Sequence, residues 1–330
     1  MVHTLPHPFF ILAPMDDVTD TVFRQIVADC AAPDLFFTEF VNVDGLQSPG
    51  RSKLLKKLRF IEGEQSLIVQ VWGLNPDNFY RTARELVDGT FVRELGLPEG
   101  VTIAGIDINM GCPDKTVVKN GACSALINDR ELALDIIHAV QEGADGIVPV
   151  SVKTRLGFNT IDLSWHELLL NQKLNMLTIH GRTRKEMSKV PAHWEEIGRI
   201  RELRDQLAPA TSIVGNGDVA NRLHGLQLAE QYKLDGIMIG RGIFHDPFAF
   251  AEDSPWDTFS AEQRIELYRK QVELFKATWQ QGERPVHTLN KSCKIYIQGF
   301  DGAKELRERL MTAHTADELL TILDHAYSAA

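Results

Sequence analysis

Short apolar runs recur through the first three quarters of the chain, separated by stretches with helical spacing. The runs are rich in β-branched and aromatic residues, and most are continuous, which is typical of parallel strands buried on both faces. They cover Phe9–Ala13, Leu35–Phe40, Leu67–Trp72, Ile103–Asn109, Pro149–Thr154, Met176–His180, Ser212–Asn216 and Gly236–Gly240. Helical patterns lie between them at Thr19–Cys30, Pro76–Val87, Asp129–Gln141, Trp194–Leu207 and Arg222–Tyr232.

This alternation predicts an α/β fold. Eight strands alternating with helices over about 250 residues fit a (β/α)8 TIM barrel in number and in size. A doubly wound open sheet is the alternative, because it is built from the same units. On strand count we favour the barrel.

The pattern changes after residue 250. Ala251–Phe259 is acidic and contains a proline, which indicates a linker, and Ser260 followed by Gln263 has the form of a capping box. Further helical stretches are expected at about His287–Gln298, from Asp301 and from Thr315. We therefore expect a barrel domain over residues 1–250 and a small all-α helical bundle domain over residues 251–330.

Composition limits the classes of protein that need to be considered. The chain has 330 residues, of which 44% are apolar and 24% charged, so it is not a disordered protein. No run approaches eighteen apolar residues, and Met1–Phe10 lacks the pattern of a secretory signal, so we expect no membrane association. The four cysteines, Cys30, Cys112, Cys123 and Cys293, form no CxxC pair, which favours a reduced, cytoplasmic setting and no metal site. A monomer is the default expectation.

The net charge of −10 argues at first against a nucleic-acid partner. The charge is unevenly distributed, however. Arg51–Phe60 holds five basic residues and no acid, and Ser151–Val190 and Arg264–Lys294 each hold seven basic against three acidic residues. A solvated helix face explains any one of these segments. The three together indicate a basic track from the barrel mouth to the helical domain.

Polar residues follow nearly every predicted strand, at the end where TIM barrels carry their active sites. A solvated loop explains each of them separately but explains the whole set poorly. Lys153 lies inside a strand, where a lysine needs a compensating partner, so we favour a functional role for it. The turns Asn216–Asp218 and Gly240–Gly242 follow the last two strands, where many barrels bind a phosphate. Two ordinary tight turns are the alternative.

Cys112 is the most distinctive residue of the predicted mouth. It follows a strand end and precedes Pro113, which stiffens the loop. A thiol with an ordinary pKa of about 8.5 is mostly protonated near pH 7, so it can act as a general acid as readily as a nucleophile. The other three cysteines lie within or beside helical patterns and are better explained by packing.

The sequence resembles the tRNA-dihydrouridine synthases of bacterial type. The motifs that carry the resemblance follow the order of the family and cover nearly the whole barrel: Leu12–Asp20, Thr38–Phe40, Gln70, Asp107–Pro113, Lys119–Leu126, Ser151–Gly157, Thr178–Arg184, Gly215–Asp218 and Met238–Gly242. The helical tail is similar to the family's C-terminal tRNA-binding domain. The resemblance implies FMN-dependent reduction of specific uridines in tRNA to 5,6-dihydrouridine, with NADPH or NADH as the reductant.

The resemblance also implies roles for individual residues. The flavin would be bound by Pro14, Met15, Asp16, Gln70, Lys153 and His180, and its phosphate by Asn216, Gly217, Asp218, Gly240 and Arg241. The uracil would be positioned by Asn109 and Arg155, helped by Arg182 or Arg184. Hydride would reach C6 of the uracil, and Cys112 would protonate C5.

The chain departs from the family at Lys185–Trp194, where a Gln and a Tyr-x-Gly segment are common, and at Asn120 and Cys123, where glycine is common. These departures concern the uridine contacts and the subfamily. Two alternatives stay open. Another FMN-dependent barrel of the dihydroorotate dehydrogenase type, acting on a free pyrimidine, leaves the helical tail unexplained. An RNA-binding barrel without redox activity leaves Cys112 and Lys153 unexplained.

Overall fold

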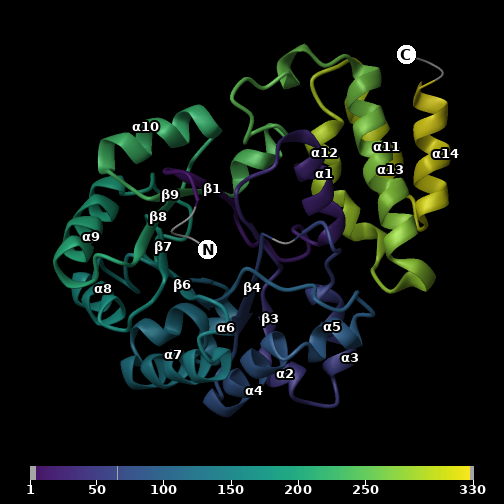
Figure 1. Cartoon of the computed structure of the whole chain (residues 1–330). Coiled ribbons are helices and arrows are strands. Elements are labelled where there is room, and N and C mark those ends of the chain that lie inside the picture. Colours follow the sequence, from purple (N-terminus) through teal and green to yellow (C-terminus); the bar gives the residue numbers. More distant parts are fainter. Residues whose placement is uncertain (1–4, 65, 328–330) are drawn as a thin grey trace.

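The computed structural model describes residues 5–64 and 66–327, so the first four residues of the Met1–Phe10 stretch lie outside it. Parallel strands form a barrel with helices around it and a helical region on one side (Figure 1). The strands are β1 Phe9–Leu12, β2 Phe36–Phe37, β3 Val41–Asn42, β4 Leu67–Trp72, β5 Gly105–Met110, β6 Val150–Arg155, β7 Met176–His180, β8 Ser212–Asn216 and β9 Gly236–Ile239.

The strand order is β1-β9-β8-β7-β6-β5-β4-β2, and β3 pairs with β4 beside β2. The first strand pairs with the last, and a parallel bridge between Ile11 and Leu35 joins β1 to the chain entering β2. The sheet is therefore nearly closed. This confirms the barrel and excludes the doubly wound open sheet, in which the outer strands stay unpaired.

The predicted second strand, Leu35–Phe40, is interrupted between β2 and β3. The cause is Thr38, whose hydroxyl oxygen accepts the backbone N–H of Gln70 at 3.1 Å in place of a carbonyl group of the strand. The side chain of the next residue, Glu39, is completely buried. The interruption directs this carboxylate toward the C-terminal region.

The interior of the barrel is a packed core and not a channel. A separate apolar cluster fills it, made of Phe9, Ile11, Ala13, Leu35, Phe37, Ile68, Ala104, Met176, Val214 and Met238. Small residues are needed where this core is crowded: a Cβ on Gly236 would lie 2.5 Å from the ring of Phe9. Polar side chains are thereby displaced toward the carboxyl ends of the strands.

Within the described part of the chain, ten α-helices accompany the barrel strands. They are α1 Thr21–Ala31, α2 Val43–Leu46, α3 Arg51–Leu55, α4 Pro76–Val87, α5 Thr90–Glu94, α6 Lys115–Lys119, α7 Arg130–Ala144, α8 Leu163–Leu170, α9 Trp194–Leu207 and α10 Arg222–Tyr232. The local sequence determines where several of these helices begin. Asp20, Asn75 and Asp129 are the N-cap residues of α1, α4 and α7, and their side chains accept hydrogen bonds from backbone N–H groups of the first turn. The long helices predicted from periodicity agree with these bounds to within a few residues.

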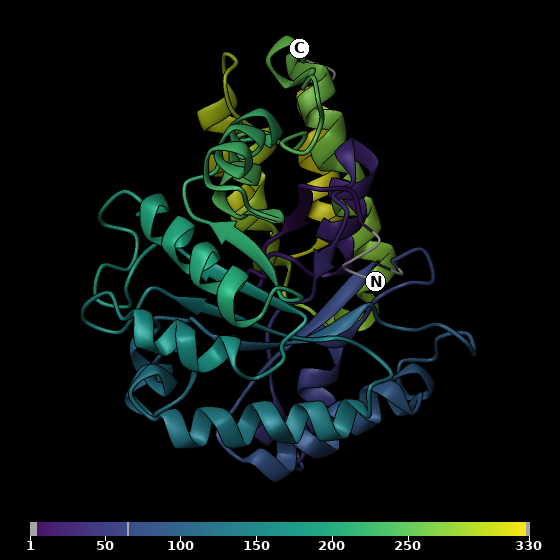
Figure 2. The same ribbon diagram turned by 60° about the vertical axis from the view of Figure 1, so that its left-hand side comes forward.

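The C-terminal region is helical, as predicted. It contains α11 Ala261–Thr278, α12 Asn290–Tyr296, α13 Ala303–Met311 and α14 Ala316–Tyr327. Both halves of the Ser260–Gln263 capping box are formed at the start of α11. Helix α11 packs against α1, and the C-terminal helices group on that side of the barrel (Figure 2). None of the helices described here is long and apolar enough to cross a membrane.

Candidate active site

A cavity of about 630 Å³ opens at the carboxyl ends of the strands. Its volume is in the range of small-molecule and cofactor sites. Eleven of the residues predicted to form the site line it: Pro14, Met15, Lys153, Arg155, His180, Arg182, Asn216, Gly217, Asp218, Gly240 and Arg241. The other five, Asp16, Gln70, Asn109, Cys112 and Arg184, do not line this cavity, and their contacts are described below.

One side of the mouth, on β6 to β9, carries the cationic side chains Lys153, Arg155, Arg182 and Arg241, and we call it the cationic wall. Lys153 Nζ donates to Asn216 Oδ1 at 3.2 Å, and Asn216 Nδ2 donates to the carbonyl of Met238 at 2.9 Å, which fixes the amide. Burial and the neighbouring Arg155 lower the pKa of Lys153 to about 8. Lys153 is thus a half-buried cation whose charge is not fully compensated by its neighbours, and an anionic ligand would compensate it.

His180 is neutral at this wall. Burial, together with the charges of Arg155, Lys153 and Arg182, holds its pKa well below the ordinary value. Arg182 Nη1 lies 3.1 Å from His180 Nε2, and because a guanidinium can only donate, the ring nitrogen accepts. The hydrogen of His180 is therefore on Nδ1, where it can be donated.

Arg182 and Arg241 both bind Asp218. Arg182 pairs with Oδ2 of that carboxylate, and Arg241 Nη2 donates to Oδ1 at 2.8 Å. Arg182 Nε also donates to the carbonyl of Val190 at 2.5 Å, so all three of its nitrogens have partners within the chain. The geometry makes Arg182 a support for His180 and Asp218.

The opposite side, on β4 and β5, is a chain of hydrogen bonds between two side-chain amides and a buried carboxyl group, and we call it the amide wall. Asp107 accepts from Gln70 Nε2 at 2.8 Å and from Ser151 Oγ at 2.6 Å. Gln70 Oε1 in turn accepts from Asn109 Nδ2 at 3.0 Å. Asp107 is fully buried, and burial raises its pKa to about 6, so the carboxylate form still predominates at pH 7. The orientation of both amides therefore follows from Asp107.

The amide wall ends at Cys112. Asn109 Oδ1 accepts the backbone N–H groups of Gly111 at 3.0 Å and Cys112 at 2.9 Å, which holds the loop in a tight turn. A hydrogen bond from the Cys123 thiol, opposed by burial and assisted by the N–H of Asp114, lowers the pKa of Cys112 to about 7. The thiol therefore titrates near neutral pH, where a proton donor is most effective.

The two remaining arginines differ in position. Arg155 Nε donates to the carbonyl of Gly111 at 2.7 Å, and its Nη1 donates to the carbonyls of Thr183 and Met187, so it joins the Cys112 loop to the loop after β7. Arg184 instead lies over the ring of Phe158, 5.2 Å from its centroid. Arg155 is thus next to Cys112, and Arg184 is a neighbour of the mouth.

Asp16 is also displaced from the cavity, because its carboxylate pairs with Lys57. Together with Asp17 and Glu39 it forms a group of three carboxylates whose nearest oxygens lie within 4.8 Å. Their counter-charges are the side chains of Lys57, Lys291 and Arg284. Asp17 and Glu39 thus form ion pairs with the C-terminal region, and Asp16 pairs within the barrel.

Sequence reasoning did not assign roles to Asp107, Cys123 or Arg284. The sequence could have indicated Asp107, since it is two residues before Asn109 and therefore lies on the same face of the strand. The indication for Cys123 is weaker: it is a cysteine where the family often has glycine. Nothing in the sequence indicates Arg284, because its partner Glu39 is 245 residues away in the chain.

Much of the predicted basic track is paired with acids. Arg51 pairs with Glu85 and Glu94, Arg59 pairs with Glu283, and Lys270 pairs with Asp29. Several of these pairs are exposed, and exposed pairs are weak enough to exchange partners when a polyanion binds. The basic track stays a prediction.

Comparisons with known proteins identify the family of the chain. Residues 11–330 match the family model described as dihydrouridine synthase (Dus). A probable tRNA-dihydrouridine synthase 2 of Bacillus subtilis is 45% identical over 324 residues, covering 97% of this chain and 94% of the relative. A probable tRNA-dihydrouridine synthase of Staphylococcus aureus (strain COL) is 44% identical over 323 residues, covering 97% and 93%.

A solved structure of a 2-naphthoyl-CoA reductase has a TM-score of 0.50 and 10% identity, covering 73% of this chain and 49% of that one, and supports the fold alone. Fold, site and relatives define a flavin-dependent oxidoreductase that modifies tRNA. The chain belongs to the dihydrouridine synthase family, whose members form dihydrouridine. This excludes both alternatives, the free-pyrimidine dehydrogenase and the barrel without redox activity.

Proposed function

We propose that this tRNA-dihydrouridine synthase uses FMN, reduced by NADPH or NADH, and that Cys112 is its general acid. The cofactor would be bound by Pro14, Met15, Asp16, Gln70, Lys153, His180, Asn216, Gly217, Asp218, Gly240 and Arg241. Asn109, Arg155, Arg182 and Arg184 would act on the uracil side. Two of these residues, Arg182 and Asp16, act through neighbours, because their charged groups are already paired.

The donor set of the cavity fits FMN. Arg241 lies at the turn after β9 and provides a cation for a phosphate, while Asp218 keeps its guanidinium in place. Gly240 leaves space, since a Cβ there would meet only Ala13, at 3.5 Å. Lys153 and the donor of neutral His180 suit a ring that gains negative charge on reduction.

The reaction on the uracil consists of one hydride transfer and one proton transfer. When bound, reduced FMN supplies the hydride that adds to C6 of the uracil. Cys112 then gives its thiol proton to C5, and the resulting thiolate recovers a proton from solvent. Cys123 and the N–H of Asp114 stabilise that thiolate by donating to its sulfur.

The uracil must leave the tRNA stack to reach the mouth, as in other base-modifying enzymes. One hydrogen of the Asn109 amide group is bonded to Gln70, and its oxygen accepts two backbone N–H groups. A single hydrogen is left to donate, so Asn109 would bind a carbonyl oxygen of the uracil. Helices α11 to α14 would contact the tRNA as the family's C-terminal domain does, in a cytoplasmic monomer.

The observation that carries this proposal is the position of Cys112 beside a cofactor-sized cationic cavity, with a thiol whose pKa is about 7. The test is anaerobic incubation of the purified protein with a tRNA transcript and NADPH, followed by mapping of dihydrouridine. We expect a yellow protein with an FMN spectrum that reduces defined uridines in tRNA and not free uridine. A protein that copurifies with FAD, or that reduces free uridine equally well, would contradict it.

A further inference from the structure

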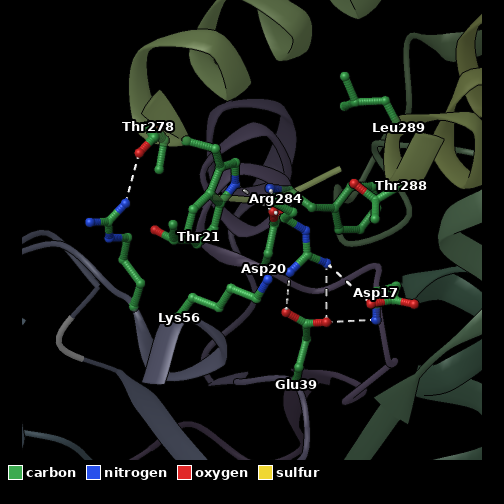
Figure 3. A network of polar contacts seen from close by, with 12 residues as sticks. Asp17, Asp20, Thr21, Glu39, Lys56, Thr278, Arg284, Thr288 and Leu289 are labelled. Atoms are coloured by element: carbon green, nitrogen blue, oxygen red, sulfur yellow. Dashed lines mark hydrogen bonds and ion pairs between the residues drawn. The ribbon is translucent and has the colours of Figure 1, made fainter. Parts of the chain in front are cut away.

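Arg284 enters the barrel from the C-terminal region and is buried there among carboxylates (Figure 3). Its side chain is 4% exposed. Nη1 donates to Glu39 Oε2 at 2.9 Å and Nη2 donates to Glu39 Oε1 at 3.1 Å, which is a two-pronged pair. Nε lies 3.3 Å from Asp20 Oδ2. Burial opposes the charge of this arginine, but these carboxylates raise its pKa, so it stays a cation.

Glu39 connects this arginine to the loop after β1. The same Oε1 that faces Arg284 also accepts the backbone N–H of Asp17 at 2.6 Å. Asp17 has a φ of 55°, a conformation that most residues avoid, and the bond to Glu39 helps to hold it there. Pro14 and Met15, only a few residues earlier in this loop, line the cavity.

Asp20 connects Arg284 to a second barrel element. Its Oδ1 caps α1 by accepting the N–H of Phe23 at 2.9 Å, and its Oδ2 accepts Nε1 of Trp279 at 3.0 Å. Trp279 directly follows α11, and the guanidinium of Arg284 lies 5.7 Å from its ring centroid. One buried cluster therefore joins the loop after β1, the N-terminus of α1 and the end of α11.

Contacts nearer the surface surround this cluster. Lys56 Nζ donates to the carbonyl of Glu283 at 2.8 Å, Arg59 Nη1 donates to that of Thr278 at 2.7 Å, and Lys291 pairs with Asp17 at 3.0 Å. Exposed ion pairs exchange easily with solvent. The buried pair of Glu39 and Arg284 is the contact that restricts geometry, because a fork bound to both oxygens of a carboxylate has little freedom.

We propose that Arg284 is a positioning residue for tRNA reduction: by holding Glu39 and Asp20 it fixes the C-terminal helices relative to the Pro14–Met15 edge of the cavity. The inference rests on the proposed binding of tRNA by those helices. If the helices hold the tRNA and the cavity holds the flavin, then this contact sets the distance between the flipped uracil and the reacting atoms. Small errors in that distance cost large factors in rate.

The variant that tests this role is Arg284→Met with Glu39→Gln. Arg284→Met alone would leave Glu39 buried without a counter-charge and would destabilise the fold. The double variant removes both charges at similar volume, and the amide that Glu39→Gln introduces still has an oxygen to accept the N–H of Asp17. Asp20 keeps its bonds to Phe23 and Trp279.

A matched control exists in the barrel itself. Arg24 Nε pairs with Glu64 Oε1 at 2.5 Å, and both side chains are buried. Among the described residues their hydrogen bonds go only to barrel residues, including Thr19, Thr21 and Arg59. Arg24→Met with Glu64→Gln therefore removes a comparable buried pair while Arg284, Glu39 and their mutual contact stay in place.

The measurements are melting temperature, flavin content, the rate of flavin reduction by NADPH, and kcat and KM for tRNA. For Arg284→Met/Glu39→Gln we expect kcat on tRNA to fall tenfold or more, while flavin content and flavin reduction stay within twofold of the wild type. The control pair is expected to lower the melting temperature at least as much and to leave kcat on tRNA within twofold. Arg284→Lys, which keeps the charge without the fork, should give an intermediate kcat.

Two results would overturn the inference. One is a wild-type kcat in the Arg284→Met/Glu39→Gln variant, and the other is an equal loss of kcat in both double variants, which would mean that only stability matters. A wild-type protein that forms no dihydrouridine in tRNA would instead refute the proposed function, so the two failures are distinguishable.

Discussion

The two walls of the barrel mouth are built on opposite principles. The cationic wall gathers Lys153, Arg155, Arg182 and Arg241 around an open cavity and has Asp218 as the carboxylate in its lining. The amide wall has a buried carboxylate, Asp107, at its base, and each of its amides is already bonded within the chain. The first wall has charge left to offer to a ligand, and the second has its geometry fixed in advance.

This difference separates two tasks. A wall with uncompensated cations is stabilised when an anion binds. Substitutions there should therefore change the amount of bound flavin and its reduction potential. A wall of satisfied amides gains little from the flavin, and it positions Cys112 through Asn109. Substitutions at Asn109 should change the chemistry on the uracil and leave flavin binding nearly unchanged.

The largest effect is expected for Cys112→Ala. Loss of a general acid costs about 10²- to 10⁴-fold in rate. We expect kcat for tRNA to fall by that factor, while FMN content and tRNA affinity stay as in the wild type, measured by absorbance and by filter binding. Cys293→Ala, at a buried cysteine of the C-terminal region, is the control and should retain full activity. Wild-type turnover by Cys112→Ala would remove the thiol from the mechanism.

The next largest effect is expected on the cationic wall. A hydrogen bond to a charged group contributes about 1.5–3 kcal/mol, which corresponds to about a 10- to 100-fold change in affinity. Lys153→Met should weaken FMN binding by this factor and make the flavin harder to reduce, as measured by fluorescence titration and by potentiometry. Lys173→Met, at a lysine outside the mouth, is the control. Unchanged affinity and potential would show that the cationic wall does not hold the flavin ring.

The sequence predicted the elements of both walls but only part of their contacts. Runs such as Met176–His180 and Ser212–Asn216 coincide with β7 and β8, because buried parallel strands have a strong local signal. The side-chain partners depend on register between strands. Gln70 lies opposite Asp107, and Asp107 opposite Ser151, only because β4, β5 and β6 pair as they do.

Contacts made by loops could not be predicted at all. Cys123 reaches Cys112 through a short 3-10 turn, and Arg284 reaches Glu39 across most of the chain. No local pattern encodes such pairs, since each depends on how separately folded segments meet. The pair of Asp16 and Lys57 is a contact of the same kind, since the motif of Asp16 lies beside the cavity and its carboxylate is bound by a lysine 41 residues further along the chain.

A smaller effect, visible mainly in the pH profile, is expected for Cys123→Ala. Without the hydrogen bond from Cys123, the pKa of Cys112 should rise from about 7 toward its ordinary value of about 8.5. The proton-donating thiol is lost as pH rises through the pKa, so wild-type activity should decline above about pH 7 and the activity of the variant should persist to higher pH. The pH dependence of alkylation by iodoacetamide measures the same pKa directly, with Cys30→Ala as the control. Identical profiles would show that Cys123 does not tune Cys112.

The smallest effect is expected for Asp107→Asn, and it decides whether the two walls are independent. An asparagine can still accept from Gln70 with its oxygen and can donate to Ser151, whose hydroxyl turns to accept. The amide chain then survives, and kcat for tRNA should stay within about threefold, whereas Asp107→Leu removes the acceptor and should lower kcat further. Asp107 also faces the cation of Lys153, and the charge of that lysine is the link between the walls. If Asp107→Asn changes FMN affinity as strongly as Lys153→Met does, the two walls form one electrostatic unit, and positioning of Cys112 cannot be separated from flavin binding.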